Sequence, residues 1–414
     1  MRTARPEPIS LGDLAHPVYP EAAHPIRSAL AAYGTALELT PQSLMSTASE
    51  RTGLHHWGVP GFRERLDVLC AALRTEAELS AAGTAIVFEQ LAGNLVNRLR
   101  LEALIAEHPE IEEVAIERPI IICGLPRSGT THLHNLIAAD PNIRSLPYWE
   151  SLEPFPAPGE TDDQCRRDRC AAGLELLDST MPEFKRMHEM TVDHAHEEIQ
   201  LLANDISGML FETTYQVPTF AAHYKSHDQL PSYLYLKRSL QAVQWLRGGT
   251  RWVLKSPQHL EQFPTLYAAF PDATFVVTHR DPVEVTRSMV TMVAYGSRMA
   301  CDHPDPVAIG RYWMHRAEEL LNGCLRDRDV LPAEQSIDVR FTDFMADERL
   351  TLSAIYELAG QPFGTDVRDA MASFIAEHPR GRHGEVVYDL AAVGLNADNV
   401  AQRLLGYRER FVVP

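Results

Sequence analysis

The sequence lacks the features that mark secreted, disulfide-stabilised and membrane-spanning proteins. Its six cysteines are scattered and form no C-x-x-C pair, so we expect reduced thiols and neither a disulfide framework nor a zinc ribbon. The longest apolar run, near residues 120–125, is too short to cross a bilayer. No apolar run follows the N-terminal segment MRTARPEPISLGDLAHP, so we expect no signal peptide and a cytoplasmic location.

Positive charge is also scarce. Lys and Arg number 38 against 56 Asp and Glu, which gives a formal net charge of −18 with His neutral. Such an acidic chain lacks the broad basic field that nucleic acids require, so we expect no nucleic-acid partner. Any site for a phosphate or sulfate must therefore be a small local pocket.

The rest of the composition is that of a globular protein. Hydrophobic residues make up 45% of the 414 residues, enough to bury a large core. Apolar residues between 61 and 107 recur at three- and four-residue spacing, which predicts helices. After Pro109, short β-branched runs alternate with helical patterns, and this alternation predicts a parallel α/β sheet. The predicted strands cover 118–123, 251–254, 273–278 and 336–340, and the predicted helices cover 131–139, 258–270, 283–294 and 350–360.

These patterns predict a P-loop-like parallel sheet flanked by helices, with an N-terminal helical extension and a helical insertion. We expect residues 1–115 to form a helical region that wraps the core, and residues 116–414 to form the α/β domain. Residues 161–245 are mostly helical in pattern and are expected to lie over the carboxyl edge of the sheet, where α/β proteins bind their ligands.

The strongest local motif is the loop Gly124-Leu-Pro-Arg-Ser-Gly-Thr-Thr131, between a predicted strand and a predicted helix. Its glycines and final threonine match the nucleotide-binding P-loop, in which backbone N–H groups and the helix start hold an anion. Thr130 stands where an NTPase carries its phosphate-binding lysine, and the positive charge lies inside the loop at Arg127. We infer that this loop binds a phosphate and that the group transferred beside it is not the phosphoryl group of an NTPase. The alternative is a P-loop nucleotide kinase or NTPase. A third hypothesis is a catalytically silent nucleotide-binding module.

Residues 126–131 (Pro-Arg-Ser-Gly-Thr-Thr) resemble the 5′-phosphosulfate loop of sulfotransferases that use 3′-phosphoadenosine 5′-phosphosulfate (PAPS). Residues 253–257 (Val-Leu-Lys-Ser-Pro) resemble the Lys-Ser strand end of tyrosylprotein-type and related bacterial members. Residues 278–288 resemble the family's 3′-phosphate motif, and residues 380–382 (Arg-Gly-Arg) resemble the basic loop that closes over the same phosphate. The resemblance implies transfer of a sulfuryl group from PAPS to a hydroxyl or amine of an unidentified small-molecule acceptor, without a metal.

The same resemblance implies roles for residues of the donor site. The residues expected to bind PAPS are Arg127, Ser128, Gly129, Thr130, Thr131, Arg280, Ser288, Arg380, Gly381 and Arg382. In-line sulfuryl transfer needs fixed positive charge around the equatorial and leaving oxygens. We expect Arg127 and Lys255 to supply it, with Lys255 protonating the departing phosphate oxygen and Ser256 assisting.

The sequence does not determine which residue acts as the general base. It must lie within hydrogen-bond reach of the attacking oxygen. Glu150 is the counterpart of the base in tyrosylprotein sulfotransferases, at a spacing a few residues longer. A rival cluster, Asp193-His-Ala-His-Glu-Glu198, contributes His196, Glu197 and Glu198, and similar bacterial members carry a Glu-Glu pair there. His134, in the helix after the loop, is a further candidate.

A metal site is not expected. His188-Glu189 begins like the zinc motif H-E-x-x-H, but Val192 occupies the position of its second histidine. His194 and His196 offer ligands for a new site, which metal analysis of the purified protein would detect. The sequence does not determine the acceptor or the number of subunits, and a homo-oligomer is compatible with it.

Overall fold

A four-stranded parallel sheet, in the order β3-β2-β4-β5, lies at the centre of the α/β domain predicted for residues 116–414. The computed structural model describes residues 6–413; residues 1–5, part of the segment for which no signal peptide is expected, lie outside the described residues. The strands are β2 (Ile120–Cys123), β3 (Val253–Ser256), β4 (Thr274–His279) and β5 (Ser336–Arg340). Cys123 pairs with Ser256, so the carboxyl ends of β2 and β3 meet at the same edge.

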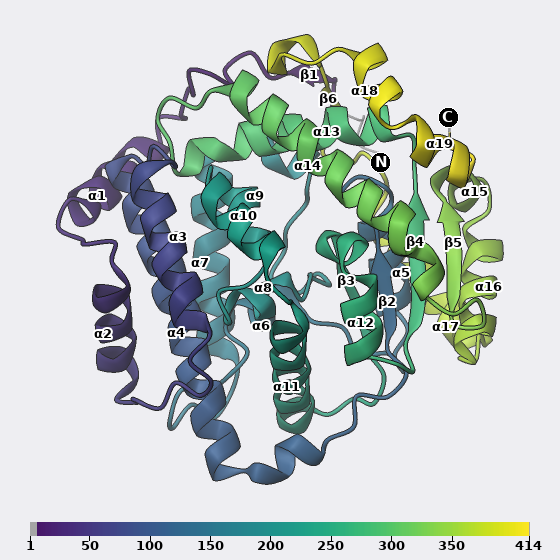
Figure 1. Ribbon diagram of the computed structural model, residues 1–414, viewed down its shortest axis with the longest axis horizontal. Helices are drawn as coiled ribbons and strands as arrows, with labels where there is room; N and C mark the ends of the chain where they lie inside the picture. The colour runs from purple at the N-terminus through teal and green to yellow at the C-terminus, as the bar shows by residue number, and fades with distance from the viewer. Residues whose placement is uncertain (1–5, 414) are drawn as a thin grey trace.

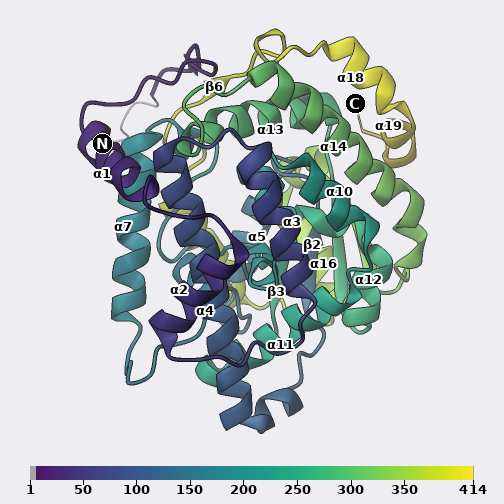
Figure 2. The ribbon, with the colours of Figure 1, turned by 60° about the vertical axis from the view of Figure 1, so that its left-hand side comes forward.

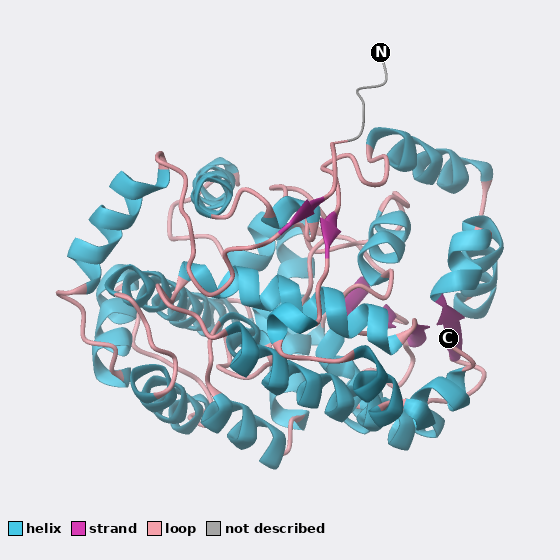
Figure 3. Ribbon diagram, turned by 90° about the horizontal axis from the view of Figure 1, so that it is seen from above, coloured by secondary structure: helices cyan, strands magenta, loops and turns pink. Residues whose placement is uncertain are grey.

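Helices cover both faces of this sheet, as the buried strands require. Ile120 and Ile122 of β2 pack in one apolar cluster with helices α5, α15, α16 and α17, whereas Ile121 and Cys123 pack in another with α12, α13 and α14. This alternation follows from the two-residue period of a strand. Figure 3 shows the strands, in magenta, surrounded by helices. The bounds are α5 (Thr130–Ala138), α12 (Phe263–Ala269), α13 (Pro282–Gly296), α14 (Pro306–Asp327), α15 (Phe341–Ala346), α16 (Glu348–Ala359) and α17 (Thr365–Glu377).

The N-terminal helices pack mainly on the predicted insertion. Their apolar cluster joins Leu66 of α3 and Leu91 of α4 to Phe211 and Phe220 of the insertion. Buried Arg98 of α4 adds an ion pair to Asp205, 2.7 Å away. Figure 2 shows α2, α3 and α4 in front of the strands. The helices are α1 (Ala23–Gly34), α2 (Pro41–Thr52), α3 (Phe62–Thr75) and α4 (Ala81–Glu107). The domain limits 1–115 and 116–414 stay a prediction.

The segment between α5 and β3 is mostly helical, and much of it lies between the N-terminal helices and β3 (Figure 1). Its elements are α6 (Tyr148–Leu152), α7 (Gln164–Thr180), the short 3₁₀ helix η2 (Phe184–Arg186), α8 (Ile199–Ala203), α9 (Leu210–Thr214), α10 (Pro218–Ser226) and α11 (Leu230–Arg247). The irregular stretch between η2 and α8 is the part that carries the histidines and glutamates of the rival cluster.

A segment near the N-terminus pairs with a C-terminal segment in a small second sheet. Strand β1 (Ile9–Ser10) pairs in parallel with β6 (Val386–Val387), and α18 (Ala397–Arg403) and α19 (Leu405–Phe411) follow. The pairing holds the segment after Arg382 against the N-terminal region. Among residues 6–413, no helix combines the length and the apolarity needed to cross a membrane.

Most predicted elements differ by one or two residues at an end, and two differ more. The strand predicted at 251–254 runs from Val253 to Ser256, because the polar Lys255 and Ser256 continue the ladder with β2. The helix predicted at 258–270 is divided into the 3₁₀ helix η3 (Pro257–Glu261) and α12, which has Pro264 in its first turn. Proline is tolerated there because the first-turn N–H has no intrahelical partner.

Candidate active site

The glycine loop leaves β2 at its carboxyl end and is packed tightly against β4. A Cβ atom at Gly124 would lie 2.0 Å from Oγ1 of Thr278, so no larger residue fits without displacing β4. The hydroxyl of Ser128 is 2.7 Å from the Leu125 carbonyl oxygen and 2.8 Å from Thr278 Oγ1. The Ser128 hydroxyl therefore holds the loop in place, and these contacts do not use the backbone N–H groups at the start of the following helix.

Helix α5 begins directly after the loop without a side-chain cap. Gly129 precedes it with φ of 89°, a left-handed conformation that glycine adopts without strain. No side chain of the described residues accepts a hydrogen bond from the first turn, which starts at Thr130 and Thr131. Free N–H groups and the helix dipole make such a start a site for an anion.

Arg127 connects the loop with the predicted 3′-phosphate motif. Its Nε donates to Ser288 Oγ at 3.0 Å, and its guanidinium also donates to the Met187 carbonyl oxygen. Arg280 donates to the Arg127 carbonyl oxygen at 2.6 Å and stacks on Phe341, 4.1 Å from the ring centroid. Burial and the neighbouring charge of Arg127 lower the pKa of Arg280. The structure thus brings these three predicted residues together, although Arg280 and Ser288 meet through Arg127.

Lys255 and Ser256 lie beside the loop at the end of β3. Lys255 is only 3% exposed and pairs with the carboxylate of Glu197. Ser256 is fully buried, and its Oγ has no hydrogen-bond partner among the described residues. A buried hydroxyl without a partner is costly, so this atom is suited to an absent polar ligand.

Glu198 is held below this pair by a buried network. One oxygen accepts the Lys255 backbone N–H at 2.7 Å, and the other lies 2.6 Å from Nε2 of His259. The second ring nitrogen of His259 is 2.8 Å from the Tyr233 hydroxyl. Burial alone would raise the pKa of Glu198, but the hydrogen bond and charge of His259, together with the backbone N–H donors of Glu198 and Lys255, outweigh burial and lower the pKa. Each oxygen of Glu198 already accepts one hydrogen bond and the side chain is fully buried, so Glu198 holds β3 in position.

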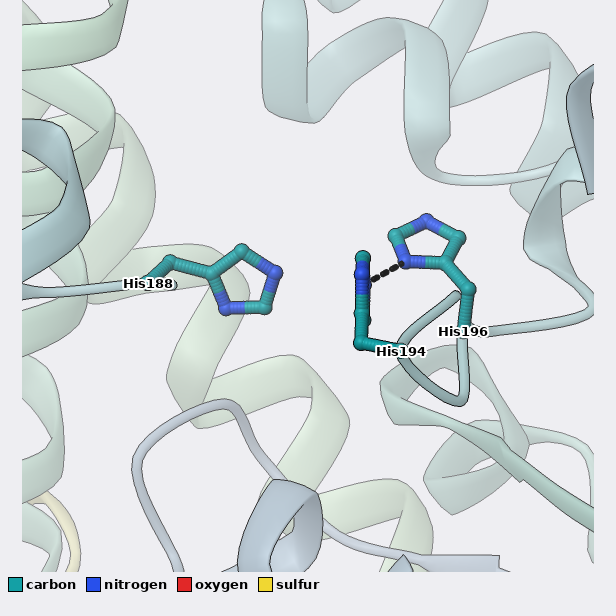
Figure 4. Close-up of side chains that lie close together, drawn as sticks. All are labelled: His188, His194 and His196. Carbon is teal, nitrogen blue, oxygen red and sulfur yellow. Dashed lines mark hydrogen bonds between the residues drawn. The ribbon is translucent and has the colours of Figure 1, made fainter. Parts of the chain in front are cut away.

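Three histidines gather next to Lys255 (Figure 4). His194 lies between His188 and His196, and its Nε2 is 2.9 Å from Nδ1 of His196. The Nδ1 of His194 lies 2.6 Å from the Thr191 carbonyl oxygen and 3.0 Å from the Thr191 backbone nitrogen, so it can donate to the first or accept from the second. When His196 Nδ1 donates in its hydrogen bond to His194 Nε2, the lone pair of His196 lies on Nε2.

These imidazoles are neutral at physiological pH. Burial, reinforced by the charge of Lys255, lowers the pKa of His188 to about 3. Burial and the neighbouring histidines hold the pKa of His196 well below its usual 6.5. His134, fully buried in α5, also has its pKa lowered to about 3 by burial. A neutral imidazole can accept a proton, which is what a general base requires.

Glu150 lies in a different cluster. Its carboxylate contacts Arg144 at 2.6 Å and Arg247 at 2.9 Å, and it is fully buried. Arg144 pairs with Trp252, at the amino end of β3, whereas the loop lies at the carboxyl end. Burial raises the pKa of Glu150. Among the described residues, the ion pairs of Glu150 are with Arg144 and Arg247, and not with the loop, Lys255 or the histidines.

The basic residues near the C-terminus reach the same segment as Arg127. Arg382 forms an ion pair with Glu189, and His383 Nε2 lies 2.9 Å from the same carboxylate. Gly381 has φ of 66°, which permits the turn. Arg380 points toward Glu348 of α16, 3.6 Å away. Because Glu189 is adjacent to His188, the segment at 187–189 joins the glycine loop to the basic loop.

Sequence reasoning missed His259, His188 and His383 as parts of this site. His259 follows the Lys-Ser strand end without a spacing that marks it, and His383 is adjacent to the basic loop and could have been included with it. His188 was considered only as the start of a zinc motif. Its proximity to Lys255 depends on the fold of the irregular segment before α8.

Comparison with known proteins finds one family model and several similar structures. A family model described as "Sulfotransferase family" matches residues 119–365. The structure of sulfotransferase STF9 from Mycobacterium avium is 26% identical, with a TM-score of 0.81 over 91% of this chain and 98% of that one. Sulfotransferase STF1 from Mycobacterium tuberculosis H37Rv is 30% identical, with a TM-score of 0.77 over 88% of this chain and 98% of that one. No curated protein matches the chain.

Proposed function

This chain belongs to the sulfotransferase family, and from that premise we propose that it transfers the sulfuryl group of PAPS to a hydroxyl or amine of a small-molecule acceptor. The observation that carries the proposal is the meeting of Arg127, Lys255 and an uncapped helix start at one sheet edge. A P-loop kinase is not favoured, because Thr130 replaces the lysine of an NTPase and the family match points to sulfuryl transfer.

The donor is proposed to bind along the loop and the two basic segments. The free N–H groups of α5, with Thr130 and Thr131, would hold the 5′-phosphate, and the unpartnered hydroxyl of Ser256 fits one more acceptor oxygen. Arg280, Ser288 and the residues 380–382 would hold the 3′-phosphate, for which a planar guanidinium fork is well suited. No metal is needed for this arrangement, because fixed cations supply the charge.

Lys255 and Arg127 are proposed to stabilise the transition state. The acceptor oxygen or nitrogen attacks sulfur in line, the bond from sulfur to the phosphate oxygen breaks, and 3′,5′-ADP leaves with the electron pair. Lys255 neutralises the charge on the departing oxygen and donates a proton to it, while Arg127 lies against the equatorial oxygens. Lys255 must exchange Glu197 for the donor, because its ammonium is already paired in the structure.

We propose His196 as the general base. Its Nε2 lone pair is free when Nδ1 donates to His194, and the imidazolium formed by the acceptor's proton keeps that hydrogen bond. Glu198 has both oxygens occupied, and Glu150 is paired with two arginines at the other end of β3, so neither is proposed to take the proton. Glu197, whose carboxylate already serves Lys255, is proposed to orient that lysine.

Replacement of Lys255 by Ala tests the catalytic assignment. With ³⁵S-labelled PAPS and a panel of phenols, alcohols and amines, we expect turnover to fall by about 10²–10³-fold while 3′,5′-ADP still binds. Lys237→Ala on α11 is the matched control, since Lys237 donates to the Ala269 carbonyl oxygen and lies over the Phe270 ring, outside the proposed site. Near-normal turnover of the Lys255 variant would reject the role.

The base is tested with His196→Asn. We expect turnover at saturating acceptor to fall by about 10²–10⁴-fold with unchanged affinity for 3′,5′-ADP. Because the pKa of His196 is held below 6.5, wild-type turnover should be constant near neutral pH and fall only under acidic conditions. An Asn variant that keeps both the rate and the pH profile contradicts the assignment. The cytoplasmic location and the number of subunits stay predictions.

A further inference from the structure

A second group of imidazoles lies on the surface, where the N-terminal region meets the insertion. His223 is on α10 and His227 follows it at the end of that helix; their ring centroids are 4.0 Å apart. Glu64, from the first turn of α3, faces them, with its carboxylate 3.9 Å from His227 Nε2. One ligand atom from each of the three lies within 4.8 Å of the others.

The hydrogen bonds of His227 leave the correct nitrogen available for a metal. Its Nδ1 is 2.7 Å from the His223 carbonyl oxygen, so Nδ1 carries the proton and Nε2 carries the lone pair. A histidine that ligates a metal commonly donates its other N–H to a carbonyl or carboxylate in this way. The two histidines are four residues apart, so that the helix places them on one face, and a glutamate completes a His₂Glu set.

We propose that Glu64, His223 and His227 bind a divalent transition-metal ion of the zinc type. The His227 side chain is 48% exposed and that of Glu64 is 71% exposed, so an ion and one or two waters can reach the site. Imidazole nitrogens with a single carboxylate suit zinc better than calcium or magnesium, which prefer oxygen ligands.

The ion joins two segments that are distant in the sequence. Helices α3 and α10 lie side by side (Figures 1 and 2), and Arg65, next to Glu64, already contacts the Asp205 carbonyl oxygen at 2.8 Å. Metal binding therefore stabilises the packing of the N-terminal helices on the insertion. This role is separate from sulfuryl transfer and does not rest on it.

The cluster of His188, His194 and His196 is the internal competitor for zinc. It is less suited to the ion, because His194 and His196 already bond to each other and the charge of Lys255 lies nearby. A dication is repelled by that ammonium, whereas the surface site supplies a carboxylate. Variants of the two clusters therefore separate the two locations.

The experiment is a calorimetric titration of the tag-free full-length protein with zinc chloride, together with thermal unfolding. We expect one equivalent to bind and to raise Tm, and we expect His227→Ala and Glu64→Gln to weaken binding at least about tenfold. His194→Ala should retain both binding and the Tm increase. Circular dichroism and 3′,5′-ADP binding establish that each variant is folded. Absence of stoichiometric binding to the wild type, or binding lost in His194→Ala but kept in His227→Ala, overturns the proposal.

Discussion

Neutralising Glu189 should strengthen nucleotide binding. In the structure this carboxylate pairs with Arg382 and with His383, residues of the proposed 3′-phosphate loop. Burial alone would raise the pKa of Glu189, but hydrogen bonds from Arg382 and His383 outweigh it and lower the pKa, so the group is ionised at neutral pH. A phosphate must displace this carboxylate before Arg382 and His383 can bind it. Glu189→Gln removes the competing charge.

The magnitude follows from the exposure of the pairs. The side chains of Arg382, His383 and Glu189 are 28%, 30% and 34% exposed, so solvent screens each pair. Partly exposed pairs are worth about 0.2–1 kcal/mol each, and two together correspond to about 2- to 30-fold in affinity. Because the free Glu189→Gln variant lacks these ion pairs, the nucleotide does not have to break them, and its Kd for 3′,5′-ADP should be lower by that factor.

The assay is calorimetry with 3′,5′-ADP at low and high ionic strength. Glu183→Gln is the matched control, because it removes the same charge from the same segment, where Glu183 pairs with Arg186 and not with the basic loop. We expect no gain in affinity for this control, and a smaller gain for Glu189→Gln at high salt. Unchanged or weaker binding by Glu189→Gln, with the control unaffected, would refute the competition.

Three further outcomes are expected. His134 is protonated near pH 6.5 in the unfolded chain but only near its pKa of about 3 in the folded chain. As the pH falls below 6.5, this group should therefore lower the free energy of unfolding by about 1.4 kcal/mol per pH unit. Urea unfolding against pH measures this, and His134→Asn should have the smaller slope. Gly124→Ala should lower the free energy of unfolding by about 1–3 kcal/mol and weaken 3′,5′-ADP binding, because the added Cβ meets Thr278. An unchanged Tm would contradict this. Arg98→Ala removes a buried ion-pair partner of Asp205 and should lower the free energy of unfolding by about 3–5 kcal/mol, measured by denaturant titration. A decrease below about 1 kcal/mol would show that the ion pair is not required.

The parallel sheet and the glycine loop were predictable because their signals are local. The run at 120–123 is buried on both faces, and such a strand has no polar alternation. Gly129 and Thr130 mark the start of a helix by themselves. The end of β3 was less predictable, because Lys255 and Ser256 resemble loop residues until their pairing with β2 is known.

The general base was not predictable from spacing alone. Glu150 and Glu198 are both acids near expected positions, but only the fold shows that one pairs with Arg144 and the other with His259. Their oxygens are occupied by groups from distant segments. The availability of His196 similarly depends on a hydrogen bond to His194 and on burial, which no local pattern encodes.

The sequence by itself determined the class of fold and the anion-binding loop, because apolar periodicity and glycine positions act over a few residues. Tertiary structure decided which charged groups meet, since Arg127, Ser288, Lys255 and Glu189 come from segments far apart in the chain. Electrostatic and hydrogen-bonding roles depend on distances of a few ångströms and on burial. Both are fixed only when the insertion and the C-terminal segment pack around the strand ends.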